Sequence, residues 1–230
     1  MPVRLILLRH GETDWNAEDR YQGRTDVDLN ATGQRQARAA VARFLAGALE
    51  DADELVAVAS PLTRARRTAE IVLEAAVGDA ELTLDPDLME LHGGDWEGLR
   101  LTEIAERWPA EHEAWRGTPD LDAGPVAGET LRAGGQRVLA ALGEHVPPAW
   151  TPARGAGERA PQAPVLLAVA HGGVLRSAVG QLLGAEGEDF AALERIENAC
   201  AVVFEGDCAA GGPSSRRIVD GCWQLRGYNV

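Results

Sequence analysis

The chain has 230 residues, of which 45% are hydrophobic and 25% are charged, which fits one domain with a substantial core and excludes a disordered or fibrous chain. Its net charge of −14 and its pI of 4.8 argue against nucleic acid or an anionic membrane as a general partner. We therefore expect a single domain over residues 1–230, in which local arginines attract any anionic substrate against a repulsive overall field.

The cysteines and the start of the chain indicate a cytoplasmic protein. Cys200, Cys208 and Cys222 form no Cys-x-x-Cys pair and have no histidine at zinc spacing, so we expect inert thiols in a reducing compartment. The chain opens without the pattern of a secretory signal, and no apolar run is long enough to span a bilayer. Asn30-Ala31-Thr32 matches the glycosylation triplet, but without secretion we interpret Thr32 as a helix N-cap.

The predicted elements alternate between strands and helices. An apolar run at 3–8 predicts a buried strand, and apolar residues at helical spacing predict an amphipathic helix over 32–49. A second strand at 55–59 precedes a second helical register at 65–76. The further predicted elements are a short strand at 82–84, helices at 102–108 and 131–142, a strand at 165–170, a helix at 174–183, and late strands at 200–204, around Ile218 and at 223–225.

This alternation predicts an α/β fold. We expect three α/β/α layers, with a mainly parallel central sheet, helices on both of its faces and the late strands at an edge. The stretch at 147–164 is rich in proline, glycine and alanine, a composition that does not build a core. We interpret it as a surface loop, because the sheet pattern resumes directly after it.

Two of the predicted strands end in the same way, with a histidine followed by a glycine. His10-Gly11 follows the first strand and His171-Gly172 follows the strand at 165–170. Parallel strands bring both histidines to one edge of the sheet, where open α/β sheets bind ligands. A lone histidine at a strand end is usually a structural hydrogen-bonding group, but two in equivalent settings, one of them beside Arg9, indicate a functional site.

Arg64 follows the second strand and is expected at the same edge. A cation at a helix N-terminus is unfavourable unless an anion compensates it, whereas we interpret Arg66 and Arg67 as solvated. A neutral imidazole between two guanidiniums suits phosphoryl transfer, because guanidinium groups bind non-bridging oxygens and their field keeps the imidazole unprotonated. A proton donor for the leaving alcohol is also needed, and spacing alone does not choose among Asp87, Glu90, Asp95 and Glu97.

An ordered set of motifs covers nearly the whole chain. They are Leu8-Arg9-His10-Gly11-Glu12-Thr13-x-Trp15-Asn16, Gln22-Gly23, Asp28-Leu29-x-x-x-Gly33, Ser60-x-Leu62-x-Arg64-Ala65-x-x-Thr68-Ala69, Leu88-x-Glu90, Gly94-x-Trp96-Glu97-Gly98 and Ala170-His171-Gly172-Gly173. This set resembles the histidine phosphatase superfamily, also called the phosphoglycerate mutase-like family. The ending Trp223-Gln224-Leu225 and Tyr228-Asn229 is similar to the phosphatase branch of that family.

The resemblance implies a role for each site residue. His10 matches the nucleophile that forms a phosphohistidine, Glu90 matches the general acid and base, and Arg9, Arg64 and His171 match the phosphate pocket. No metal and no cofactor is implied. The candidate substrate-binding residues are Gly11, Thr13, Asn16, Gln22, Gly23, His92 and Gly172.

Family members divide between phosphatases and cofactor-dependent mutases. Where mutases carry an arginine, a tyrosine and a lysine this chain has Leu91, Gly93 and Leu101, and it has no adjacent arginine pair between Gly98 and His171. We therefore expect a phosphatase that hydrolyses a small phosphorylated metabolite. The segments at 90–96 and 127–130 are similar to actinobacterial members that act on sugar phosphoglycerates, which favours a sugar phosphate or a phosphoglycerate derivative as the substrate.

Three alternatives stay open at this point. The chain could be a cofactor-dependent phosphoglycerate mutase, or a phospholigand-binding protein of the same fold without activity. A metallohydrolase with His10, His92 and His171 as ligands is a third alternative, disfavoured because the chain has no close-set His/Asp ligand motif. Members of the family often pair as homodimers, which the resemblance makes an expectation here.

Overall fold

The computed structural model describes residues 3–45, 48–49, 52, 54–117, 120–147, 150, 163–207, 218–219 and 221–230. These residues form a six-stranded sheet with the order β3-β2-β4-β1-β5-β6. The strands β1 to β4 are mutually parallel, and β5 and β6 complete the sheet in antiparallel pairings. The strands are β1 (Val3–Arg9), β2 (Leu55–Ala59), β3 (Leu82–Leu84), β4 (Val165–Ala170), β5 (Ala201–Asp207) and β6 (Cys222–Tyr228).

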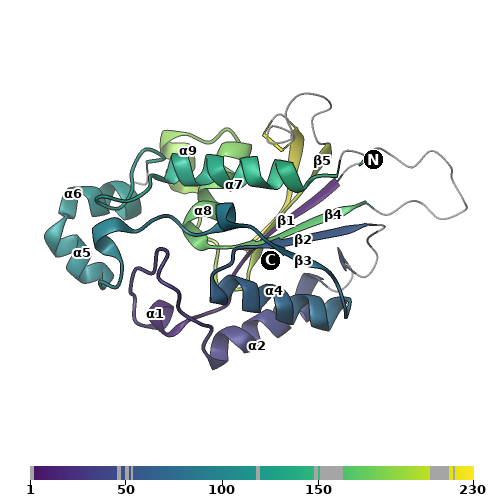
Figure 1. Cartoon of the computed structure of the whole chain (residues 1–230). Helices are drawn as coiled ribbons and strands as arrows, with labels where there is room; N and C mark the ends of the chain where they lie inside the picture. The colour runs from purple at the N-terminus through teal and green to yellow at the C-terminus, as the bar shows by residue number, and fades with distance from the viewer. Residues whose placement is uncertain are drawn as a thin grey trace, which may run out of the picture.

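Helices cover both faces of the sheet, as Figure 1 shows. On one side lie α7 (Leu131–His145), α8 (Gly172–Leu182) and α9 (Gly187–Ala192), and on the other lie α2 (Ala31–Ala40) and α4 (Thr63–Ala76). Short helices gather at one end of the sheet (Figure 1). The short elements are α1 (Asp14–Ala17), η1 (Val41–Leu45), η2 (Pro86–Leu88), η3 (Gly94–Trp96), α5 (Leu101–Arg107), α6 (Pro109–His112) and η4 (Glu113–Gly117).

The central strand β1 divides the core into two layers. Leu5 and Leu7 pack into the cluster under α7 and α8, while Ile6 and Leu8 pack into the cluster under α2 and α4. All four side chains are buried. Successive side chains of a strand point to opposite faces, so a continuous apolar run is what a strand covered on both faces requires. The predicted three-layer α/β/α fold with a mainly parallel sheet is confirmed.

The two glycines that weaken the helical pattern at 131–142 have a packing role. A Cβ at Gly134 would lie 2.3 Å from Cδ2 of Leu91, and a Cβ at Gly135 would lie 2.5 Å from Oγ of Ser177 on α8. Both distances are too short for real atoms, so Gly134 makes room for the side chain of Leu91 and Gly135 lets α7 approach α8 closely. The helix therefore forms despite the low intrinsic helix propensity of its glycines.

The structure corrects the predicted start of the helix at 32–49. Asn30, not Thr32, is the N-cap of α2, and its side chain accepts a hydrogen bond from Gly33 N. The α-helix ends at Ala40 and continues as the single π-turn η1. Asn and Thr are both good N-caps, so composition did not decide between them.

Two further predictions concern the C-terminal part and the proline-rich stretch. Of the strand expected around Ile218 only Ile218 and Val219 are described, and both lie in a turn, with the side chain of Ile218 buried in the core. Residues 208–217 and 220 lie outside the described residues. The late strands at 200–204 and 223–225 correspond to β5 and β6, and β6 is the edge strand as predicted. The loop predicted at 147–164 falls mainly on residues 148–149 and 151–162, which lie outside the described residues.

None of the helices that the structure describes combines the length and the apolar character that a membrane span needs.

Candidate functional site

The carboxyl ends of three parallel strands meet at the predicted site. Arg9 at the end of β1 pairs with Ala170 of β4, and Ala59 of β2 pairs with Val169 of β4. The next residue on each strand is therefore brought to the same edge: His10, His171 and Ser60. The rings of His10 and His171 stand edge to face with their centroids 5.2 Å apart. The convergence of the two histidines, expected from the sequence, is observed.

The hydrogen bonds of His10 define its tautomer. Its Nδ1 lies 2.7 Å from the carbonyl oxygen of Gly11. A carbonyl oxygen only accepts hydrogen bonds, so Nδ1 carries the proton and Nε2 keeps a free lone pair. Because His10 is 3% exposed and lines the cavity described below, Nε2 is the nitrogen that a bound phosphoryl group meets.

His171 has the opposite tautomer. Arg64 donates from Nε to Nδ1 of His171 over 3.2 Å, and since a guanidinium only donates, Nδ1 of this ring is unprotonated. Its Nε2 therefore carries the proton and donates to Oγ of Ser60 at 2.8 Å. Arg64 also donates to the carbonyl oxygens of Thr25 and Gly23, at 2.9 Å and 2.7 Å.

Burial and positive charge keep both histidines neutral. Burial, followed by the charges of Arg64 and Arg9, holds the pKa of His10 well below its usual value of 6.5. The pKa of His171 is held well below that value by burial first and then by Arg64. The pKa of Arg64 itself is lowered to about 10, chiefly by burial, so this side chain stays cationic at neutral pH.

Arg9 is anchored at one nitrogen and unpartnered at another. Its Nη1 donates to the carbonyl oxygen of Ile196 over 2.8 Å. Its Nε is buried and has no hydrogen-bond partner among the described residues. A Cβ at Gly172 would lie 3.1 Å from that Nε, so the glycine leaves the guanidinium accessible. A buried donor without a partner is costly, and a bound anion is the natural group to satisfy it.

The carboxylate of Glu90 is held by backbone N–H groups at the start of α8. Its Oε2 accepts from Gly173 N and its Oε1 from Val174 N, each at 3.0 Å, and Oε1 also accepts from Leu91 N. Glu90 and His10 line the same cavity. This placement singles out Glu90 among the four acids that the sequence left open.

An ion-pair network holds the backbone around Glu90. Arg137 donates to both carboxylate oxygens of Glu129, at 2.9 Å and 2.7 Å, and to the carbonyl oxygens of Asp87 and Met89. Arg24 donates to the carbonyl oxygen of Glu90 at 3.3 Å and lies 3.4 Å from Glu129. The network ties the segment that carries Glu90 to α7.

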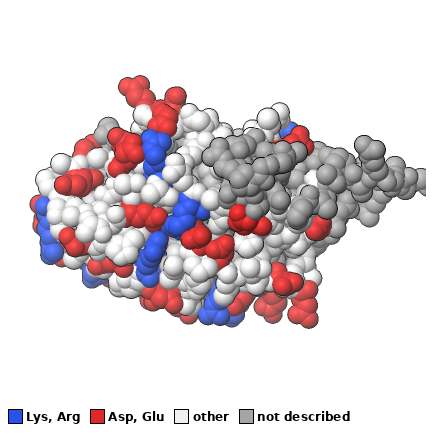
Figure 2. All heavy atoms as spheres, turned by 45° about the horizontal axis from the view of Figure 1, so that its top comes forward, with Lys and Arg blue, Asp and Glu red and all other residues white. Residues whose placement is uncertain are grey.

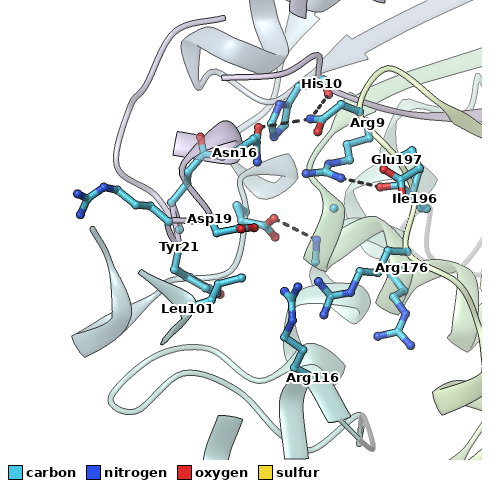
Figure 3. A pocket seen from close by; sticks show the side chains of 18 of the residues that line it. Arg9, His10, Asn16, Asp19, Tyr21, Leu101, Arg116, Arg176, Ile196 and Glu197 are labelled. Carbon is cyan, nitrogen blue, oxygen red and sulfur yellow. Dashed lines mark hydrogen bonds between the residues drawn. The ribbon is translucent and has the colours of Figure 1, made fainter. Parts of the chain in front are cut away.

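These groups surround a cavity of about 390 Å³, shown in Figure 3, within the range of about 300 to 1,000 Å³ typical of small-molecule sites. His171 lies behind this lining, fully buried against His10 and Arg64. The predicted site residues that line the cavity are Arg9, His10, Asn16, Gln22, Gly23, Arg64, Glu90 and Gly172.

Three predicted substrate-binding residues lie outside the lining. Gly11 packs against Gly33, where a Cβ would lie 2.5 Å from the Gly33 carbonyl oxygen. Thr13 is the N-cap of α1, and its hydroxyl is 3.1 Å from Oε1 of Gln22. His92 accepts a hydrogen bond from Gly94 N on the exposed side of its loop. In this structure the first two support the phosphate pocket from behind, and His92 stands apart from it.

Sequence reasoning missed most of the outer wall of the cavity. The residues concerned include Tyr21, Trp115, Arg116, Arg176, Arg195 and Asn198. Asn198 donates to the carbonyl oxygen of His10 at 3.1 Å and lies 3.3 Å from Oδ1 of Asn16, so it orients both. These residues come from separate short segments without a shared spacing. The pair Trp115-Arg116 and the run at 195–198 are adjacent in sequence, but neither stands at the end of a predicted strand, where the sequence predicts a site.

No group of three or more His, Cys, Asp or Glu side chains within the described part of the chain is arranged to hold a metal ion.

The family model of the histidine phosphatase superfamily, branch 1, matches residues 5–220. The chain belongs to this superfamily. A glucosyl-3-phosphoglycerate phosphatase of Mycolicibacterium vanbaalenii is 34% identical over 99% of this chain and 94% of its own length. A 2,3-bisphosphoglycerate-dependent phosphoglycerate mutase of Parvibaculum lavamentivorans is 35% identical over 96% of this chain and 98% of its own length.

Solved structures of the superfamily share the fold. The mycobacterial glucosyl-3-phosphoglycerate phosphatase in complex with VO3 matches 99% of this chain and 98% of its own, with a TM-score of 0.78 and 30% identity. The superfamily match, together with these phosphatase relatives, supports a phosphoric monoester hydrolase.

Proposed function

We propose that the chain hydrolyses a small phosphorylated metabolite through a phosphohistidine on His10, with Glu90 as general acid and base and without a metal ion. The observation that carries this proposal is the neutral, buried His10, whose free Nε2 shares a cavity with Arg9, Arg64 and Glu90. A nucleophile, two cations and a proton donor are the groups that phosphoryl transfer needs.

In the first step the lone pair of His10 Nε2 attacks phosphorus. The P–N bond forms while the bond from phosphorus to the leaving oxygen breaks, and Glu90 gives its proton to that oxygen, so the product alcohol leaves neutral. Arg64 and the unpartnered Nε of Arg9 balance the charge on the non-bridging oxygens. Asn16 and Gln22, also in the lining, contribute polar contacts to the phosphoryl group.

In the second step water attacks the phosphohistidine. The carboxylate of Glu90 takes a proton from the water as the O–P bond forms and the P–N bond breaks. Inorganic phosphate leaves, His10 regains its free Nε2 and Glu90 is again protonated. The arginines supply the positive charge that a metal supplies in other phosphatases, so the scheme requires none.

The relatives narrow the substrate class. Because the phosphatase relatives are named for glucosyl-3-phosphoglycerate, we infer a sugar phosphate or a phosphoglycerate derivative as the substrate of this chain. Gly11, Thr13 and His92, which lie outside the lining, are given no contact with the substrate in this proposal.

Compartment and assembly are part of the proposal. Cys200 and Cys222 are free thiols, which supports the reducing cytoplasm. Pairing into a homodimer rests on the family resemblance alone, and light scattering of the purified chain tests it.

The test of the proposed function is phosphate release from p-nitrophenyl phosphate and 3-phosphoglycerate in excess chelator. Wild type and His10→Ala are compared side by side. Release by wild type alone supports a metal-independent histidine phosphatase. Activity that chelator abolishes, or that survives His10→Ala, contradicts the proposal. No release from either protein favours the phospholigand-binding alternative.

Mutase chemistry is the second candidate, favoured by the mutase relative. It starts from the phosphohistidine and differs in the acceptor, which is a bound 3-phosphoglycerate in place of water. The 2,3-bisphosphoglycerate that forms returns its 3-phosphoryl group to His10 and leaves as 2-phosphoglycerate, and added 2,3-bisphosphoglycerate supplies the first phosphohistidine. Conversion of 3-phosphoglycerate to its 2-isomer, with little free phosphate, is the result that distinguishes it.

A further inference from the structure

The guanidinium groups of two arginines in the outer wall have neither a hydrogen-bond acceptor nor an acidic partner among the described residues. Arg116 of η4 and Arg195 of the segment between α9 and β5 both line the cavity. Neither guanidinium forms a hydrogen bond or an ion pair with any residue that the structure describes. The guanidinium of Arg195 lies over the ring of Trp115, 5.6 Å from its centroid, and only its backbone carbonyl accepts a hydrogen bond, from Asn229. In Figure 3 Arg116 reaches in from the side opposite His10.

This lack of partners is unusual in this chain. Acids outnumber bases by 36 to 22, and the guanidinium groups of the other arginines that the structure describes all pair with a carboxylate or donate to a hydroxyl or a backbone carbonyl. Even Arg35 and Arg38, which are exposed, donate to Oγ1 of Thr32 and to the carbonyl oxygen of Gln34. Arg132 is bound to Asp122 and Glu186, and Arg226 to Glu205. On the face in Figure 2 the blue basic groups stand beside red acidic ones. Unpaired arginines that meet at one cavity therefore indicate a place for an anion from outside the chain.

Mutual repulsion supports the same conclusion. The pKa of Arg195 is lowered to about 10, by burial first and then by the charges of Arg116, Arg176 and Arg9. Arg176 adds charge to the wall, but its Nε and Nη2 donate to backbone carbonyls, those of Leu193 included. Six arginines and three acids line the cavity, a local excess of positive charge in a chain of net charge −14.

The arginines of the phosphate pocket do not account for this pair. Arg64 donates one N–H group each to His171, Thr25 and Gly23, which fixes its guanidinium near His10 with two N–H groups left for the phosphoryl oxygens. Arg9 stands beside Gly172, next to the nucleophile. Arg116 and Arg195 come from segments outside the sheet. Guanidinium groups bind carboxylate and phosphate in bidentate geometry, so the pair matches an oxyanion on the leaving-group side of the ester.

We propose that Arg116 and Arg195 form a second oxyanion subsite, which selects phosphomonoesters whose leaving group carries a carboxylate or a second phosphate. The proposal rests on the proposed function and deepens it. It also revises the reasoning from the sequence, which found no cations for a doubly anionic substrate because it looked only for an adjacent arginine pair.

The test uses three ligands that share a glycerol skeleton. Glycerol 3-phosphate has a neutral hydroxymethyl group, 3-phosphoglycerate has a carboxylate in its place, and glycerol 1,3-bisphosphate has a second phosphate. Each is measured as a competitive inhibitor of p-nitrophenyl phosphate turnover, so that its Ki is obtained whether or not it is hydrolysed. We expect at least one of the two ligands with a second anionic group, 3-phosphoglycerate or glycerol 1,3-bisphosphate, to bind about tenfold or more tightly than glycerol 3-phosphate.

Arg116→Gln and Arg195→Gln each reduce this preference by about tenfold, while the Ki of glycerol 3-phosphate changes much less. Arg38→Gln, which removes the same charge from the exposed face of α2, keeps the wild-type preference. The lower Ki of the two, for 3-phosphoglycerate or for glycerol 1,3-bisphosphate, shows whether the subsite prefers a carboxylate or a second phosphate. Equal Ki values for the three ligands in wild type, or an equal rise of all three in the variants, would falsify the subsite.

Failure of the proposed function is distinguishable from failure of the subsite. If p-nitrophenyl phosphate is not hydrolysed, the proposed phosphatase activity is contradicted. The affinities of the same three ligands are then measured as Kd values by calorimetry, and their order tests the subsite. Normal turnover without the ranking contradicts the subsite alone.

Discussion

The inner and outer halves of the cavity are built on different principles. The inner half consists of His10, Arg9, Arg64 and Glu90, with His171 behind them. These residues stand at the ends of β1 and β4, in the first turn of α4 and in the segment after η2, and are held by hydrogen bonds. The outer half, Tyr21, Leu101, Trp115, Arg116 and Arg195, comes from short helices and connecting segments. The guanidinium groups of Arg116 and Arg195 form no hydrogen bond or ion pair with the described residues.

This difference indicates that the inner half carries out phosphoryl transfer and the outer half recognises the leaving group. Phosphoryl transfer needs groups fixed within fractions of an ångström, and a sheet edge under two helical layers supplies that rigidity. Recognition of the leaving group needs side chains that can exchange water for a ligand, and loops and short helices supply these. We expect substitutions in the inner half to affect chemistry and stability, and those in the outer half to affect the choice of substrate.

The largest effect is expected at the nucleophile. His10→Ala leaves no nitrogen to accept the phosphoryl group, so kcat falls by about four orders of magnitude or more. Labelling of the protein by a ³²P-phosphomonoester disappears together with turnover. The circular dichroism spectrum and the free energy of unfolding serve as controls. A labelled His10→Ala protein contradicts the assignment of the nucleophile.

The next effect depends on the leaving group. Glu90→Gln removes the proton donor, so kcat/KM for glycerol 3-phosphate falls by about 10² to 10⁴-fold. The loss for p-nitrophenyl phosphate is much smaller, because p-nitrophenolate leaves without a proton. Initial rates on both esters measure the two losses. Equal losses would show that Glu90 is not the general acid.

A stability difference should separate the two halves. Arg64 is fully buried and donates to three acceptors, so Arg64→Gln leaves acceptors unpaired and lowers the free energy of unfolding by about 3 kcal/mol or more. Arg116→Gln removes no described contact and changes it by less than about 0.5 kcal/mol. Urea denaturation of both variants measures these values. Similar losses would contradict the division into halves.

The pH dependence of stability tests the buried histidines. Because the pKa values of His10 and His171 lie well below 6.5 in the folded chain, the unfolded chain binds protons below about pH 6.5 that the folded chain does not. Their contribution is complete above that pH and is lost as the pH falls, at up to about 1.4 kcal/mol per pH unit for each imidazole.

Urea denaturation between pH 7.5 and 5, in buffer without phosphate, measures this slope. His171→Gln removes one titrating imidazole and should reduce this slope. A flat profile in the wild type contradicts the neutral, buried state of the two rings.

Much of the inner half was predictable because its signals are local in the sequence. An apolar run that ends in Arg9-His10-Gly11 specifies both a buried strand and the chemistry at its end, and the run before His171-Gly172 repeats the signal. Parallel pairing then brings them together. The family motifs added the role of Glu90, which spacing alone had not separated from its neighbours.

The tertiary structure alone decided the rest. The tautomers of His10 and His171 depend on the local backbone path and on partners distant in sequence. The sequence did not choose between Asn30 and Thr32 as the N-cap of α2, because both residue types are good caps. Arg116 and Arg195 meet only because η4 and the segment after α9 pack at the same rim of the cavity. Local patterns determine which strands form and what stands at their ends, whereas long-range packing determines which distant side chains share a cavity.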